Sequence, residues 1–68
     1  MNRIAVSSSN VESVGYENGK LEIGMKDGRT YRYSNVPRGT YQDLMSAPSI
    51  GKFVHERIKN QFPTERIA

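Results

Sequence analysis

The chain contains no cysteine and no tryptophan, and its longest apolar runs are only a few residues. Without cysteine, disulfide bonds and thiolate metal sites are excluded, and the chain must fold on its hydrophobic core alone. The N-terminus has no basic segment followed by an apolar run, and no stretch approaches the roughly 18 apolar residues of a membrane span. We therefore expect a cytoplasmic protein with no export signal and no membrane partner.

The length and the net charge of the chain limit the number of domains and the class of partner. A chain of 68 residues forms one small domain, which buries only about 60% of the surface that its unfolded form exposes. Ten lysines and arginines against seven carboxylates give a net charge of +3, which weakly favours an anionic partner. We treat residues 1–68 as a single domain. The serine-rich stretch near its start predicts a mobile or weakly docked arm over residues 1–9.

Alternating apolar residues then predict two strands joined by a tight turn. The dipeptide Asn18–Gly19 tolerates the positive φ angles of a two-residue type I′ turn. Such a turn pairs Tyr16 with Leu21, and Val14 with Ile23. The apolar side chains of both strands then lie on one face, and the opposite face carries small or polar side chains, namely Ser13, Gly15, Glu22 and Gly24.

The second hairpin turns at the sequence KDGR, where two loop lengths are possible. With the two-residue loop DG, Tyr31 and Tyr33 lie on the polar face, where they are available for stacking. With the three-residue loop KDG, Gly28 adopts the left-handed conformation of a G1 bulge, and Tyr31 opposes Ile23 on the apolar face. We favour the three-residue loop because every strand then has the same apolar face. Arg32 is left on the open face.

Helical spacing follows the predicted strands. Pro37 suits the start of a helix, and Tyr41, Leu44 and Met45 form one apolar stripe that ends before Pro48.

A second helix is predicted from a cap at Ser49 to the break at Pro63. Its apolar stripe comprises Phe53, Val54, Ile58 and Phe62. The sequence thus predicts an α+β fold, a three-stranded antiparallel meander followed by two helices packed on one face.

Several spaced motifs, VGY, YRY, VP, APS.GK and IK..FP, together resemble the KTSC domain. This small module is named for its occurrence at the C-terminus of some lysyl-tRNA synthetases, and it also forms stand-alone bacterial proteins. The likeness covers Ser8 to about Pro63. Two positions depart from the family pattern, since Phe62 stands where tyrosine is more usual and Met25 where an aromatic is common. The synthetase context implies RNA as a ligand, by analogy only.

Nucleic-acid binding is also the leading hypothesis from the residues. Single-stranded RNA is the best-matched ligand, because basic side chains contact phosphates and an exposed tyrosine stacks on an unpaired base. The candidate contact residues are Arg32, Arg38, Lys52, Arg57 and Lys59, and Arg66 is a further cation able to contact a phosphate. Carboxylates are interleaved with these cations, so an ordinary solvated surface is the competing interpretation.

The alternative function is a protein-interaction or homo-oligomerisation module with no nucleic-acid role. The strand Val11 to Tyr16 is expected to be an open edge that accepts another strand. An enzyme is not expected, since His55 is the sole histidine and no motif assembles a catalytic base. The same scarcity of ligands predicts neither a metal site nor a cofactor.

Overall fold

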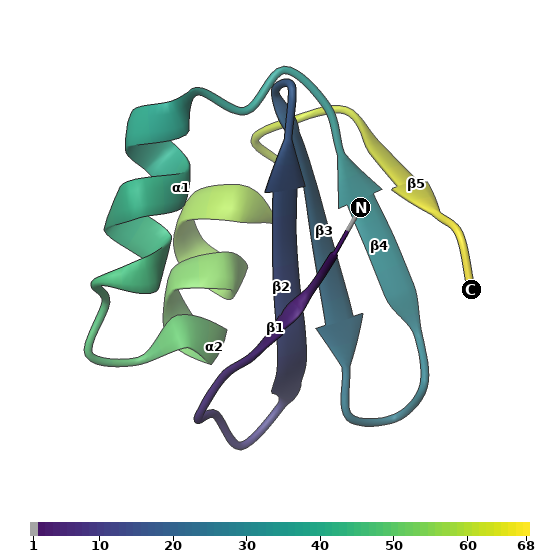
Figure 1. Ribbon diagram of the computed structural model, residues 1–68, viewed down its shortest axis with the longest axis vertical. Helices are drawn as coiled ribbons and strands as arrows, with labels where there is room; N and C mark the ends of the chain where they lie inside the picture. The colour runs from purple at the N-terminus through teal and green to yellow at the C-terminus, as the bar shows by residue number, and fades with distance from the viewer. Residues whose placement is uncertain (1) are drawn as a thin grey trace.

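The computed structural model describes residues 2–68, which form a five-stranded antiparallel sheet with helices on one side (Figure 1). The strands lie in sequence order, β1 to β5. The elements are β1 (Ile4–Ala5), β2 (Val11–Glu17), β3 (Lys20–Met25), β4 (Thr30–Tyr33), α1 (Arg38–Met45), α2 (Ile50–Phe53), η1 (Val54–Ile58) and β5 (Thr64–Arg66). The predicted α+β class and central meander are confirmed, and two short edge strands are added to the meander. None of the helices in residues 2–68 has the length and apolar character needed to cross a membrane.

The β2–β3 hairpin has the predicted register. Tyr16 lies opposite Leu21, and Val14 lies opposite Ile23. Both residues of the Asn18–Gly19 turn have positive φ, 52° and 78°, as a type I′ turn requires.

The β3–β4 hairpin has the three-residue loop. The Met25 N–H donates to the Arg29 carbonyl at 2.8 Å, and Gly28 has a φ of 97°. Tyr31 therefore lies opposite Ile23. The predicted G1-bulge register is confirmed, and both tyrosines of β4 face the helical side of the sheet.

The first helix follows the prediction, and the second departs from it. The Ser49 hydroxyl caps α2 as expected, accepting the Lys52 N–H at 3.3 Å. The predicted continuation to Pro63 is wrong, because the helix widens into the π-helical segment η1 and ends at Ile58. The Lys59 N–H donates to the Val54 carbonyl at 2.7 Å, five residues back.

The chain then reverses through Asn60, whose φ of 66° lies in the left-handed region that asparagine tolerates. This reversal returns the chain beside β4 as β5, with Arg66 opposite Tyr31 and Thr64 opposite Tyr33. The strand was not predicted, since all three of its residues are exposed and show no apolar alternation.

The N-terminal residues add the other edge strand. Ile4 and Ala5 of β1 pair with Val14 and Ser13 of β2, so the expectation that the strand Val11 to Tyr16 is an open edge was wrong. Figure 1 shows the N-terminal segment passing across the side of the sheet away from the helices. The strand β1 has only two residues, and polar residues stand close to it on both sides in the sequence, so no strand pattern identifies it.

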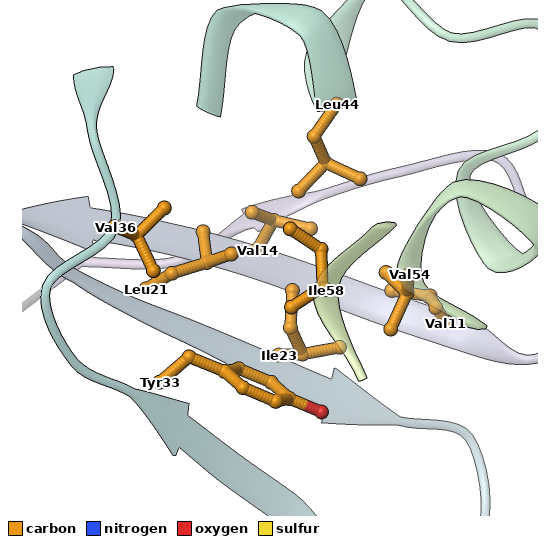
Figure 2. Packing of buried hydrophobic residues seen from close by; sticks show 9 residues of the cluster. All are labelled: Val11, Val14, Leu21, Ile23, Tyr33, Val36, Leu44, Val54 and Ile58. Carbon is orange, nitrogen blue, oxygen red and sulfur yellow. The ribbon is translucent and has the colours of Figure 1, made fainter. Parts of the chain in front are cut away.

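The core lies between the helical layer and the sheet (Figure 2). Its nine buried apolar side chains come from every layer and are Val11, Val14, Leu21, Ile23, Tyr33, Val36, Leu44, Val54 and Ile58. Phe62 packs against this cluster as a half-buried side chain from the turn after η1. In Figure 2 the Tyr33 hydroxyl points away from Val36, toward the side of the view where Val11 and Val54 lie.

Candidate functional site

A cleft of about 400 Å³ opens where the β3–β4 hairpin meets η1. Apolar and aromatic residues supply one part of its lining, Val11, Met25, Tyr31, Tyr33 and Val54. Polar and charged residues supply the other part together with Gly51, and they are Asn10, Asp27, Arg29, His55, Lys59, Asn60 and Thr64. An apolar cavity with a few convergent polar groups is the usual form of a ligand site.

The bulged loop determines which β4 side chains reach this cleft. Side chains alternate between the two faces of a strand, so a loop that turns Tyr31 to the helical side turns Arg29 and Tyr33 there as well. The β4–β5 pairing then sets Arg66 opposite Tyr31 and Thr64 opposite Tyr33. One glycine in the left-handed region therefore brings two aromatic rings and a cation to the same surface.

The end of the helical layer closes the cleft from the other side. His55 and Lys59 stand four residues apart and both line it, as does Asn60 in its left-handed conformation. Single-turn π-helical segments inside helices are frequent at functional sites. Here the widened turn ends the helix at the cleft rather than carrying it on toward Pro63.

The charges at the cleft are partly paired. Arg29 Nε lies 3.4 Å from the Asp27 carboxylate, and both side chains are more than half exposed, so the pair is screened by solvent. The pKa of Arg29 is raised from its usual value, first by the Tyr31 hydroxyl and then by the charge of Asp27. Burial, followed by the neighbouring Tyr31, raises the pKa of Tyr33. Tyr33 therefore remains a neutral hydroxyl at physiological pH.

Arg32 lies on the opposite face of the sheet, as the favoured register predicts. Its Nη2 and Nε donate to the same carboxylate oxygen of Glu22, at 2.8 and 3.1 Å. Glu22 is only 6% exposed, and Arg3 approaches its other oxygen at 3.6 Å. The charge of Arg32 is thus neutralised within the sheet.

The remaining predicted contacts are dispersed. Arg38 starts α1, close to the β2–β3 turn, since the Val36 N–H donates to the Gly19 carbonyl at 2.9 Å. That turn is at the opposite end of the sheet from the β3–β4 loop that borders the cleft.

The helical cations also diverge. Lys52 is exposed on α2, and Arg57 lies over the Phe53 ring, 5.9 Å from its centroid. Arg57 borders a separate hollow between α1 and η1, which Asp43 also lines. Of the five cations predicted from the sequence, Lys59 alone lines the cleft.

Arg29, His55 and Asn60 were not assigned to a site from the sequence. Arg29 had a usable signal, because the three-residue loop sets it opposite Met25 and hence on the same face as the tyrosines. His55 and Asn60 had none, since their approach to β4 depends on where the helix ends.

The KTSC domain model matches residues 7–62. The crystal structure of a KTSC domain protein from Yersinia pestis superimposes with a TM-score of 0.92 at 41% identity, covering 98% of this chain and 97% of that one.

Two relatives are similar to this chain over most of its length and of their own. An uncharacterized protein of Stutzerimonas stutzeri strain A1501 is 38% identical over 63 residues, covering 90% of this chain and 89% of its own. A protein of Tsukamurella paurometabola is 37% identical over 59 residues, covering 84% of this chain and 88% of its own. The resemblance noted from the spaced motifs is confirmed, and the chain belongs to the KTSC domain family.

Proposed function

We propose that this chain is a noncatalytic binding module for single-stranded RNA, and that the cleft between the β3–β4 hairpin and η1 is its contact surface. The observation that carries the proposal is the meeting of the half-buried Tyr31, packed beside the buried Tyr33, with the cations Arg29 and Lys59 in one cleft. Binding without sequence preference combines positive groups along the backbone with aromatic rings on which bases stack.

The proposal narrows the contact set that the sequence predicts. Lys59 stays in it, and Arg29 joins it. Arg66, the further cation named from the sequence, also stays in it because the residue opposes Tyr31 on the neighbouring strand. Arg32 leaves it because two of its nitrogens already bind Glu22, and Arg38 leaves it because it belongs to the other end of the sheet.

The test is a titration of a fluorescein-labelled hexa-adenylate RNA, followed by fluorescence anisotropy at several salt concentrations. Affinity should fall with salt, with a slope of about 0.7 per phosphate contacted. Lys59→Ala should weaken binding and reduce that slope by roughly 0.7. Lys20→Ala removes the same charge beside the β2–β3 turn and should leave the affinity unchanged. Absence of binding to RNA and to DNA even at low salt would contradict the proposal.

A second candidate is self-association or strand addition through the sheet edges. It is supported by the two edge strands and by Ile4 on β1, whose side chain is 55% exposed. An edge strand with an exposed apolar side chain can pair with another chain. Sedimentation velocity at rising concentration should then detect a dimer that Ile4→Glu abolishes, and a monomer at all concentrations would exclude self-association.

A further inference from the structure

The cleft has features that backbone phosphates alone do not require. Phosphate binding needs only cations on an open surface, whereas this cleft of about 400 Å³ is also lined by the apolar and aromatic side chains Val11, Met25, Tyr31, Tyr33 and Val54. That volume lies at the small end of the range for ligand pockets, roughly 300–1,000 Å³. A cavity of this kind suits a flat ring with polar edges.

We infer that the cleft takes one unpaired nucleobase, stacked on Tyr31, while Lys59 and Arg29 hold the adjoining phosphate. This inference rests on the proposed function and names the part of the strand that the cleft recognises. Tyr31 is the ring for stacking because it is half-buried in the cleft. Tyr33 is only 5% exposed and stays in the core.

Around this ring, the cleft supplies groups that suit the edges of a base. The amides of Asn10 and Asn60 each carry donors and an acceptor. The Thr64 hydroxyl donates to the Phe62 carbonyl at 2.9 Å and retains its acceptor capacity. The buried Tyr33 keeps its proton, since burial raises its pKa. Single-stranded RNA is typically read by such hydrogen bonds to bases stacked on aromatic rings.

The charges of the cleft fit the phosphate next to that base. Lys59 lines the cleft from the end of η1, and Arg29 lines it from the start of β4. Asp27 also lines it, and its carboxylate lies 3.4 Å from Arg29 Nε, so these two charges offset each other. Arg29 then contributes the other N–H donors of its guanidinium, and Lys59 contributes the positive charge. The His55 ring adds a further N–H donor on the helical side.

The experiment is an NMR titration of the ¹⁵N-labelled protein with hexa-adenylate RNA and with an abasic ribose-phosphate strand of the same length and charge. The abasic strand should bind between about 5-fold and 150-fold more weakly, the range for stacking one base on an aromatic ring. Shifts caused by hexa-adenylate should be centred on β4 and the end of η1. Tyr31→Ala should lose affinity for hexa-adenylate within the same range, and Tyr31→Phe should stay within about twofold of the native protein.

The outcomes separate the two proposals. If both strands bind equally, and Lys59→Ala weakens both, the chain binds phosphates without a base in the cleft, and the inference is overturned while the proposed function stands. If neither strand binds, both fail. The ¹⁵N spectrum of Tyr31→Ala reports whether that variant is folded, and if it is not, the abasic comparison and Tyr31→Phe still decide.

Discussion

Glu22, Arg32 and Arg3 form a cluster of charges on the open face of the sheet, and this cluster allows a measurable prediction. Glu22 is 6% exposed and accepts two hydrogen bonds from Arg32, and Arg3 lies 3.6 Å from its second oxygen. We expect Glu22→Gln, which keeps the shape of the side chain but removes its charge, to destabilise the fold.

The magnitude follows from the exposure of the partners. Hydrogen bonds to charged groups contribute about 1.5–3 kcal/mol, and breaking a fully buried ion pair costs about 3–5 kcal/mol. Both arginine side chains are 35% exposed, so water hydrates them once the carboxylate is gone, and glutamine retains one acceptor. The expected loss in the free energy of unfolding is therefore about 1–2 kcal/mol, which lowers Tm by roughly 4–16 °C for a domain of this size.

Thermal unfolding followed by circular dichroism measures this loss. The control is Glu12→Gln, which removes the same charge from an exposed position of β2 that forms no ion pair within residues 2–68. The difference between the two variants should shrink in 1 M salt, because the arginines are partly exposed. Equal Tm values for the two variants at low salt would refute the reasoning.

Three further predictions concern the core and the bulge. Because the pKa of Tyr33 is raised by burial, the unfolded chain releases this proton first, so stability should fall from about pH 10 upward; Tyr33→Phe should flatten that decline in urea unfolding curves. Ile58→Ala should cost about 2–5 kcal/mol and Ile58→Val about 0.5–1.5 kcal/mol, since Ile58 is fully buried; equal costs in urea would contradict its place in the core. Gly28→Ala should cost about 1–2 kcal/mol through its φ of 97° alone, since a Cβ there meets nothing within 4 Å; an unchanged Tm would show that the loop relaxes.

The three-stranded meander could be predicted because its register is fixed by turn residues that are adjacent in the sequence to the strands they join. The turn residues Asn18 and Gly19 and the glycine of the KDG loop have few alternatives, and each fixes the register of a strand pair. The edge strands could not be predicted in the same way. Ile4–Ala5 and Thr64–Arg66 are short and exposed, and they pair because the chain passes beside an existing strand.

The candidate cleft could not be predicted from the sequence, because it too depends on segments that meet only in the folded chain. Its lining comes from the start of β2, the β3–β4 hairpin, the second helical segment with the turn after it, and the start of β5. The whole of α1 separates the strands β2 to β4 from that helical segment in the chain. The helical pattern after Ser49 predicts a regular helix to Pro63, yet the π-helical turn ends it at Ile58. That early ending is followed directly by Lys59 and by the left-handed Asn60, both of which line the cleft with Tyr31.

Gly28 is where the fold and the candidate site depend on each other. A loop shorter by one residue would move every side chain of β4 to the other face, so Arg32 would point into the core and Glu22 would lose the partner that neutralises it. The same shift would carry Arg29 and Tyr31 out of the cleft. The packing of the core and the pairing of Glu22 therefore stabilise the one register in which Tyr31 and Arg29 line the cleft together with Lys59, and substitutions that loosen the bulge should weaken the proposed RNA binding together with stability.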